Sequence, residues 1–477
     1  MRQVLPRLSH DSLSADDWVG WSACRTGFRH QGAVSLRLPT GACSFLCVPT
    51  TMLFRLRCFT RLGLCLAAAA LTLPMFEALN AAHAEATPAR PFLVLLRTPG
   101  GAEPAVRALE SRLGVRARRV YRSALRGFAA DLTPAQAEAL RSDPGVEAVQ
   151  EDRLVALAPL SQRVRLVSVA ARKKQQVIPT GIRRCGADRS VTAHINGIED
   201  SLSVDVAVLD TGIDPKHPDL NLAGSVSFVP GGVGDPHGHG THVAGIIAAR
   251  DNGIGVVGVA PGARLWSVRV LNKKGLGSWS DIIDGLDWVA ARANQIEVAN
   301  LSLSDDLTSD NAVVRAAFDG LVAKGVTVVA AAGNADVNGP KEASLAIPGR
   351  YESVIAVSAL ADSNGSAGPG AGLFRVKGSY FESDESYADF SNFGPVVDLI
   401  APGVSILSTY KNHKYAEISG TSQAAPHVSG AAALYKLTHP SATPAQVRAA
   451  LIAAGTAFAP FDAPDDHHEP ALDVSGM

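Results

Sequence analysis

Three histidines lie close together in the run DPHGHGTHVAG, residues 235–245: His237, His239 and His242. Imidazoles at this spacing can serve two different chemistries. Together they could ligate a zinc ion. Alternatively, one of them could move a proton as a general base while the other two only pack. Other polar residues of the chain distinguish between these two interpretations.

Three further apolar segments end or begin with polar side chains that could work with a general base. VAVLDTGID ends a buried strand pattern at Asp210, where a carboxylate is costly unless it has a partner. VVAAAGN ends a second strand pattern at Asn334, and SGTSQAAPHVSGAAAL places Ser422 at the start of an apolar helix. A serine becomes a useful nucleophile only when a neighbouring base takes its proton.

These four segments resemble the subtilisin family of serine proteases. D-T-G-I-D, H-G-T-H-V-A-G, A-A-G-N and G-T-S-x-A-x-P-H-V occur in the order of that family. The resemblance covers roughly residues 176–474, which we take as the peptidase domain. It implies a serine endopeptidase that hydrolyses peptide bonds through an acyl-enzyme intermediate.

The resemblance also assigns roles to single residues. Ser422 is the expected nucleophile, His239 the general base, and Asp210 the carboxylate that holds and charges the histidine. The side-chain amide of Asn334, with the backbone N–H of Ser422, is expected to bind the oxyanion. The other two histidines are expected to pack, His242 inside the domain and His237 at the rim.

Two rival interpretations remain open at this point. A zinc hydrolase of the metallo-β-lactamase type would carry an acidic residue just before the last histidine, where this chain has Thr241. A degenerate, binding-only relative would lack part of the catalytic set, whereas this sequence contains all four residues. The sequence therefore favours an enzyme without catalytic zinc.

The pattern of apolar segments predicts the elements that position these residues. From about residue 176, apolar strand runs such as VDVAVLD, VANLSL and VTVVAAAG alternate with amphipathic helices. This alternation predicts a doubly wound, mainly parallel α/β sheet with helices on both faces, as in subtilisin-like folds. The functional groups should lie at the carboxyl ends of the strands.

Residues 91–157 predict a smaller, separate domain. Their order is β-α-β-α-β, with RARRVYRSA as a further strand and Thr133 as a helix N-cap, which indicates a ferredoxin-like α+β fold. The segment resembles the inhibitory propeptide of the same family, which implies intramolecular inhibition and self-processing. Residues 159–175 are basic and predict an exposed linker. Cleavage is expected near Ala158-Pro159, or after Lys174, because proline after the bond is unfavourable.

The beginning of the chain predicts export. Residues 52–84 combine a basic front, an apolar core and an A-x-A site, which indicates a secretory signal peptide. Residues 1–51 are an upstream extension of uncertain meaning, and an artefact if translation begins at Met52. Removal of the signal leaves Cys185 alone, so the mature chain has no internal disulfide. We expect a secreted monomer, extracellular or periplasmic, without nucleic-acid or membrane partners, since the net charge is −1.

The family resemblance implies a structural calcium site built from three segments, QQVIPTG, HPDL and RDNGIGV. Side-chain oxygens would come from Gln176, Asp219 and Asn252, a donor set that suits Ca²⁺. The backbone carbonyls of Arg250, Ile254 and Val256 would complete it. The alternative is that Asp219 caps a turn and Asn252-Gly253 is an ordinary tight turn.

Peptide substrates are expected to pair with two edge strands by β-augmentation. One edge is NLSLSDD, with Ser302, Leu303 and Ser304, and the other is Gly275, Leu276 and Gly277. Asp305 stands where the family usually has glycine. It could favour a basic residue before the scissile bond, or its side chain could point to solvent.

Overall fold

The computed structural model describes residues 88–97, 101–157, 164–168, 176–306, 310–336, 339–367, 372–376, 380–458 and 464–477. The predicted signal peptide and upstream extension lie outside these residues. No helix within the described ranges is long and apolar enough to cross a membrane.

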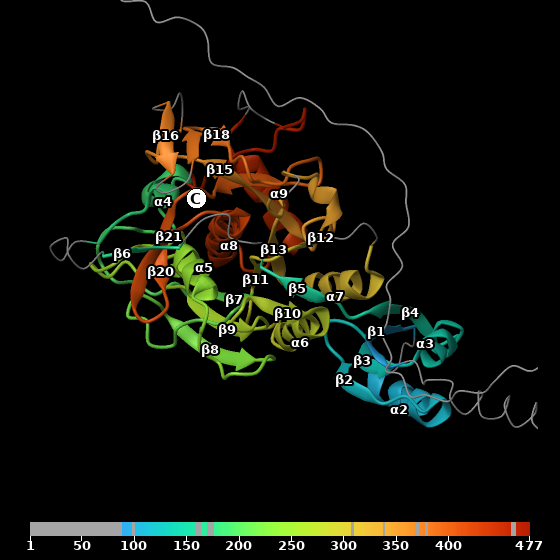
Figure 1. The fold of residues 1–477 in the computed structure, drawn as a ribbon. Coiled ribbons are helices and arrows are strands. Elements are labelled where there is room, and N and C mark those ends of the chain that lie inside the picture. The colour runs from blue at the N-terminus through green and yellow to red at the C-terminus, as the bar shows by residue number, and fades with distance from the viewer. Residues whose placement is uncertain are drawn as a thin grey trace, which may run out of the picture. The chain divides into compact units, whose positions relative to one another are not determined.

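The N-terminal domain has the predicted α+β order. All neighbours in its described four-stranded sheet are antiparallel, in the order β2-β3-β1-β4 (Figure 1). Thr133 caps the second helix in a capping box with Gln136, as the sequence predicts. The elements are β1 (Arg90–Leu96), α2 (Ala102–Leu113), β2 (Ala117–Tyr121), β3 (Gly127–Leu132), α3 (Pro134–Arg141) and β4 (Val146–Glu151).

The C-terminal domain is built on a sheet with eight strands in its described part, in the order β8-β9-β7-β11-β13-β15-β18, with β19 also on β15. All pairs are parallel except β15 with β18. The strands are β7 (Asp205–Asp210), β8 (Leu222–Ser227), β9 (Arg264–Arg269), β11 (Val298–Leu301), β13 (Thr327–Ala331), β15 (Ile355–Ala361), β18 (Ser386–Tyr387) and β19 (Leu399–Pro402).

Successive strand residues point to opposite sides of this sheet, so its apolar strands present an apolar surface on both faces. Helices cover both of these faces. In β7, Val206 and Val208 join one apolar cluster, while Ala207 and Leu209 join the other. The first cluster includes α5 (His239–Ala248) and α8 (Thr421–Thr438), and the second includes α6 (Trp279–Ala290) and α7 (Ala312–Ala323). The doubly wound α/β fold expected from the sequence is therefore confirmed.

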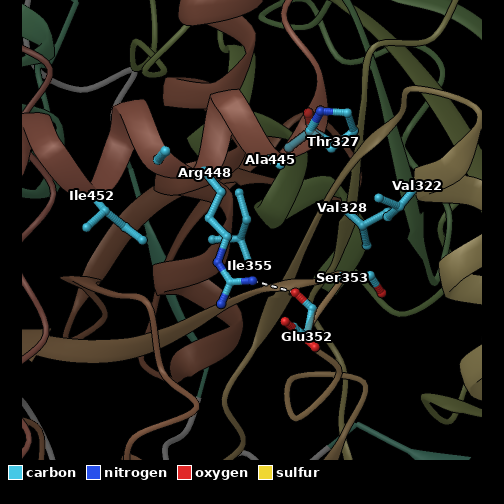
Figure 2. A pocket seen from close by; sticks show the side chains of 11 residues that line it. Val322, Thr327, Val328, Glu352, Ser353, Ile355, Ala445, Arg448 and Ile452 are labelled. Carbon is cyan, nitrogen blue, oxygen red and sulfur yellow. Dashed lines mark hydrogen bonds between the residues drawn. The ribbon is translucent and has the colours of Figure 1, made fainter.

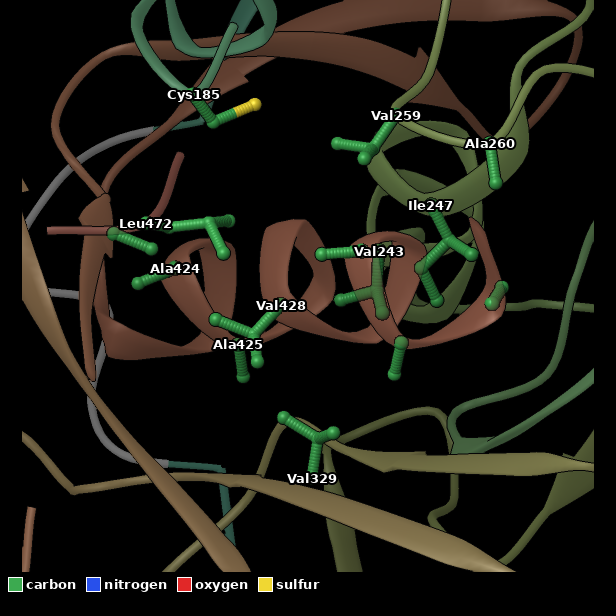
Figure 3. Close-up of a cluster of buried hydrophobic side chains, with 14 of the residues drawn as sticks. Cys185, Val243, Ile247, Val259, Ala260, Val329, Ala424, Ala425, Val428 and Leu472 are labelled. Atoms are coloured by element: carbon green, nitrogen blue, oxygen red, sulfur yellow. The ribbon is translucent and has the colours of Figure 1, made fainter. Parts of the chain in front are cut away.

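Helix α8 is buried along most of its length, and Figure 3 shows its Ala424, Ala425 and Val428 within the core. Its alanines and Gly430 allow close packing. A Cβ added at Gly430 would meet Val259 at 2.5 Å, so a larger residue here would displace the neighbouring chain.

The remaining elements are short or peripheral. They are β5 (Leu154–Ala156), β6 (Arg165–Val167), α4 (Thr180–Arg184), η1 (Ala187–Arg189), β10 (Leu276–Ser278), β12 (Asp305–Asp306), η2 (Ala343–Leu345), β14 (Ala346–Ile347), β16 (Leu373–Val376), β17 (Tyr380–Ser383), β20 (Ile406–Tyr410), β21 (Lys414–Ile418) and α9 (Pro444–Ala454).

Part of the predicted linker is a strand. Residues Arg165–Val167 form β6, which pairs antiparallel with β21 and extends the β20–β21 hairpin. Arg165 also forms an ion pair with Glu417. The basic composition of the linker does not reveal this pairing, because a three-residue strand depends on the edge that it meets.

Candidate active site

Asp210 and His239 form a buried pair at the carboxyl end of the sheet. Asp210 is the last residue of β7 and His239 the first of α5, and both are essentially inaccessible to solvent. Both carboxylate oxygens of Asp210 lie 2.9 Å from Nδ1 of His239. The backbone N–H of Thr211 donates to Oδ1 of Asp210 at 2.6 Å. The carboxylate therefore has the partners that its burial requires.

The turn before α5 fixes the orientation of the histidine. Gly238 has a φ of 108°, and a Cβ there would meet the ring of Tyr410 at 2.3 Å, so the position requires glycine. Asp235 accepts hydrogen bonds from the backbone N–H groups of His237, Gly238 and Thr241. Asp235 thus holds the start of the helix, a role that the sequence reasoning missed. An aspartate just before a helix start is a usable signal for such a cap.

The electrostatic environment suits His239 to accept a proton. Burial lowers the pKa of His239, but the charge and hydrogen bond of Asp210 more than offset it, so the pKa lies above its ordinary value. Nε2 of the ring is buried and has no hydrogen-bond partner among the described residues. The ring is therefore held at one nitrogen and free at the other.

The other two histidines do not converge with His239 on a common point. Nε2 of His242 faces the backbone carbonyls of Ile406 and Ala416 at 3.1 and 3.0 Å. That nitrogen must therefore carry a proton and cannot ligate a metal. Burial lowers the pKa of His242 to about 3, so the ring is neutral. His237 is half-buried, with its ring 6.3 Å from that of His239.

Ser422 lies in the first turn of α8, at the same end of the sheet. Its hydroxyl donates to the backbone carbonyl of Ser302 at 3.0 Å, and the hydroxyl of Ser302 donates to the carbonyl of Ser422 at 2.8 Å. No hydrogen bond joins Oγ of Ser422 to Nε2 of His239, although both residues are described. Contacts of this kind are often loose without substrate and tighten in the complex.

Asn334 is oriented by the residue before the serine. Its Oδ1 accepts hydrogen bonds from the backbone N–H and the hydroxyl of Thr421, both at 2.9 Å. A backbone N–H can only donate, so the facing atom is the oxygen and the NH₂ group points away from it. A Cβ built at Gly420 would lie 3.7 Å from both Nδ2 of Asn334 and the backbone nitrogen of Ser422. The two expected oxyanion donors therefore both lie within 3.7 Å of one point beside Gly420.

The C-terminal strand of the N-terminal domain occupies one of the expected substrate edges. Strand β5 pairs antiparallel with β10, with Ala156 opposite Leu276 and Val155 opposite Gly277. The backbone N–H of Leu157 then donates to the carbonyl of Gly275 at 2.9 Å. This is the β-augmentation expected for a peptide in the groove.

The second expected edge, Ser302 to Ser304, follows β11 directly. Ser302 and Leu303 are buried and Ser304 is partly exposed. Next to them, Oδ2 of Asp305 accepts a hydrogen bond from the indole Nε1 of Trp279 at 3.1 Å. Contact with a basic substrate residue and exposure to solvent are the two sequence expectations for Asp305. Neither includes this hydrogen bond to the ring of Trp279.

Gln176, Asp219, Arg250 and Val256, four of the residues expected to hold calcium, come together. Oδ2 of Asp219 accepts from the backbone N–H of Val256 at 3.0 Å, while its Oδ1 is buried without a partner. The side-chain amide of Gln176 donates to the carbonyls of Arg250 and Val256. In the same loop, the N–H of Ile254 donates to Oδ1 of Asn252 at 3.0 Å.

This donor set fits a cation that prefers oxygen. Burial raises the pKa of Asp219 to about 7, although hydrogen bonds to the carboxylate and the positive charge of Arg250 oppose the rise. The carbonyls of Arg250 and Val256 both face the side-chain NH₂ group of Gln176. A turn of the Gln176 amide about its last side-chain bond would present an oxygen in place of the nitrogen.

A cavity of about 320 Å³ lies at the opposite end of the sheet. It is bordered by Thr327 and Ile355, which begin β13 and β15, and by α9. Figure 2 shows Arg448 reaching across it to the backbone of Glu352. Since the catalytic candidates follow the other ends of the strands, this cavity is separate from the site.

Cys185, the one cysteine in the sequence after residue 84, is fully buried. Burial raises the pKa of its thiol to about 12, so it stays protonated and packs as a small apolar side chain, as expected.

Comparison with known proteins agrees with this geometry. Residues 202–469 match the model of the subtilase family, and residues 102–158 match the model of the peptidase inhibitor I9 family. The chain is 41% identical over 320 residues to an alkaline protease of Shouchella clausii, covering 67% of this chain and 71% of the relative. It is 44% identical over 275 residues to subtilisin Savinase of Lederbergia lenta, covering 57% and 89%.

A solved structure of a cold-adapted subtilisin-like serine proteinase superposes with a TM-score of 0.50 at 29% identity. The match covers 62% of this chain and 98% of that one. The extent of the family match and the identity to relatives along most of their length establish that this chain belongs to the subtilase family of serine endopeptidases.

Proposed function

We propose that this endopeptidase cleaves peptide bonds through Ser422, His239 and Asp210. The observation that carries the proposal is the buried Asp210–His239 pair, in which one ring nitrogen is held by the carboxylate and the other is left without a partner. A histidine held in this way can accept a proton from a nucleophile and later return it to a leaving group.

The reaction begins when the Ser422 hydroxyl turns from the carbonyl of Ser302 towards Nε2 of His239. Oγ attacks the substrate carbonyl carbon while Nε2 takes the hydroxyl proton. Asp210 stabilises the resulting imidazolium and keeps Nδ1 protonated. The imidazolium then protonates the leaving amine, and water releases the acyl group by the same steps in reverse order.

The tetrahedral oxyanion is stabilised by two fixed donors, the NH₂ group of Asn334 and the backbone N–H of Ser422. Thr421 contributes by holding the amide oxygen of Asn334, which leaves the NH₂ group directed towards the substrate. The first N–H groups of a helix also lack intrahelical acceptors, so the start of α8 favours negative charge. Donors fixed before the reaction need no reorganisation during it.

We further propose that the enzyme is made as an exported precursor, with a signal peptide at 52–84, an inhibitory propeptide at 91–157, a linker at 159–175 and the peptidase at 176–474. Strand β5 in the substrate groove supports inhibition by the propeptide. After self-processing, the enzyme is a secreted monomer, extracellular or periplasmic, that acts on proteins and peptides.

Structural calcium belongs to the same proposal. Gln176, Asp219, Asn252 and the carbonyls of Arg250, Ile254 and Val256 would hold the ion. When bound, it would supply positive charge to the buried Asp219 carboxylate and join the start of the peptidase domain to the 250–256 loop.

One experiment separates this function from the zinc alternative. The processed protein is incubated with denatured substrate protein, with and without a serine-directed phosphonate or a strong chelator. We expect the phosphonate to abolish cleavage at once, and the chelator to act only slowly, through loss of stability. Immediate loss with the chelator and none with the phosphonate would contradict the proposal.

A further inference from the structure

Strand β6, which the sequence places in the linker, is docked on the peptidase domain. It pairs antiparallel with β21, with Arg165 opposite Glu417, and these two side chains form an ion pair. Val167 lies opposite Tyr415 and packs against the apolar cluster to which Tyr415 belongs. Leu166, between them, is 54% exposed. One face of β6 is therefore fitted to the peptidase by an ion pair and by apolar packing, and the other faces solvent.

The start of the peptidase domain is fixed beside the same hairpin. The backbone N–H of Val177 donates to the carbonyl of Gly255 at 2.9 Å. A cavity of about 420 Å³ is bordered by Arg165 of β6, by residues 177–180 and by Leu407 of β20. The chain is thus anchored at β6 and again at Val177.

These two anchors bear on where the linker can be cut. A peptide enters the groove as an extended strand, as β5 does when it pairs with β10. Residues 158–163 follow β5, which already lies in the groove. Residues 169–175 instead have anchored residues on both sides of them in the sequence. A cut within 169–175 requires that one of the two anchors is released first, which disfavours it.

Departure of the N-terminal domain leaves both anchors in place. Within the described part of the chain, β6 shares its sheet with β20 and β21 and with no strand of the N-terminal domain. A cut between β5 and β6 therefore separates the domain without removing a strand partner of β6. After that cut β6 is still joined covalently to the peptidase, so its effective concentration at the β21 edge is on the order of millimolar.

We propose that β6 remains on the mature enzyme as its first strand. Self-cleavage falls between β5 and β6, and the β21 edge then holds the new N-terminal segment and protects residues 169–175 from a second cut. The partner that fits this edge is an extended segment of the chain itself, with a basic residue against Glu417 and an aliphatic residue against Tyr415. This inference rests on the proposed function, because self-processing creates the new N-terminus.

Pairing of β6 has two consequences for a secreted protease. Chain termini are usually poorly ordered and are preferred sites of proteolysis unless they are tied down. A docked β6 ties down the new N-terminus. It also covers the backbone groups of β21 that an open edge would offer to other chains.

The first test determines the N-terminus of the processed enzyme. The full-length precursor is expressed and left to process itself, and samples are blocked with the phosphonate at successive times. Intact mass and N-terminal sequencing should give an N-terminus at or before Arg165, so that β6 is complete, and it should persist after processing has ended. A stable, fully active enzyme that lacks part or all of β6 would overturn the inference.

Two proline variants test the role of the pairing. Neighbouring residues of an antiparallel strand direct their N–H groups alternately towards and away from one partner. One of Leu166→Pro and Val167→Pro must therefore remove a hydrogen bond to β21, and that variant should undergo a second cut in the linker and lose β6. Ala170→Pro, beyond β6, is the matched control and should be processed like wild type. Full retention of β6 in both variants would contradict the proposal.

Hydrogen exchange of the processed, phosphonate-blocked enzyme reports the pairing directly. Strand β21 lies between β20 and β6, so the N–H groups of Tyr415, Ala416 and Glu417 alternate between these two partners. At least one of these amides should exchange about three- to tenfold more slowly in wild type than in the variant that loses β6, as for one net hydrogen bond. Equal exchange in the two proteins would show that β6 is not docked.

The outcome also separates this inference from the proposed function. Failure of the wild-type precursor to cut itself, or cleavage of Ser422→Ala in the same host, would overturn self-processing. Self-cleavage followed by loss of β6 would overturn the inference alone.

Discussion

At the scale of single residues, the site depends on a balance between burial and charge. His239 is fully enclosed, which by itself would favour the neutral ring, and Asp210 compensates for this with its charge and hydrogen bond. His242 is enclosed to the same degree but faces only carbonyls, so its pKa falls to about 3. The pKa values of the two histidines therefore shift in opposite directions because His239 has Asp210 as a partner, and not because the two rings differ in burial.

The first prediction compares histidines. His239→Ala should lower kcat by a factor on the order of 10⁶, which is the magnitude that loss of the matching histidine has in subtilisin itself. His237→Ala should cost far less, because its ring makes no hydrogen bond to Asp210. Steady-state kinetics on one peptide substrate measure both variants, and equal losses would show that the base is wrongly assigned.

The second prediction concerns pH. The base must be neutral to accept a proton, so kcat/KM should rise with pH as His239 loses its proton, at a pH above the ordinary histidine value of about 6.5. Asp210→Asn removes the charge that raises this pKa, so the rise should move to lower pH. The same change should lower kcat about 10⁴-fold, since the ring loses its correct tautomer. An unchanged pH–rate profile in Asp210→Asn would contradict the assignment of Asp210 as the partner that raises the pKa of His239.

At the scale of elements, the ends of strands and the starts of helices bring the chemistry together. Asp210 ends β7, Asn334 follows β13, and His239 and Ser422 lie in the first turns of α5 and α8. The carboxyl ends of parallel strands share one edge of the sheet, so these residues meet although they are far apart in sequence.

The third prediction tests the calcium site. A chelator should lower the melting temperature of phosphonate-blocked enzyme, and added calcium should restore it, because a ligand that binds only the folded state stabilises it. Asp219→Ala should reproduce most of the loss and abolish the response to calcium. Asp319→Ala, at an exposed position on α7, is the control and should respond like wild type. A melting temperature insensitive to calcium would exclude the site as described.

The sequence predicts the elements whose pattern is local. Apolar runs give the central strands, and the four motifs give the positions of Asp210, His239, Asn334 and Ser422. It does not predict what depends on partners far away in the chain. Asp235 holds the start of α5, Asp305 holds the ring of Trp279, and β6 exists only because β21 offers an edge.

At the scale of the whole molecule, the N-terminal domain and the peptidase lie within one compact unit and share both a buried apolar cluster and a set of polar contacts. Oδ1 of Asp287 on α6 accepts from the backbone N–H groups of Arg122, Ser123 and Ala124 at 3.0, 2.5 and 2.8 Å. Arg119 contacts Asp281 and Asp284 on the same helix. These contacts hold the domain against the face from which β5 enters the groove.

The fourth prediction concerns maturation. If the chain cuts itself, Ser422→Ala should accumulate as uncut precursor in a host without other suitable proteases, since the nucleophile is missing and the fold is intact. Intact mass and N-terminal sequencing measure the outcome. Asp287→Ala should still be cut but should release activity sooner, because the N-terminal domain loses three hydrogen bonds to the peptidase. Normal processing of Ser422→Ala would refute self-cleavage.

The most direct measurement of the central claim is covalent labelling of the processed enzyme with a fluorophosphonate, followed by mass spectrometry of its peptides. The account predicts one adduct, on Ser422, formed in step with loss of activity. Labelling should be greatly slowed in His239→Ala and absent in Ser422→Ala. An adduct on another residue, or full proteolytic activity in a protein whose Ser422 is completely labelled, would contradict it.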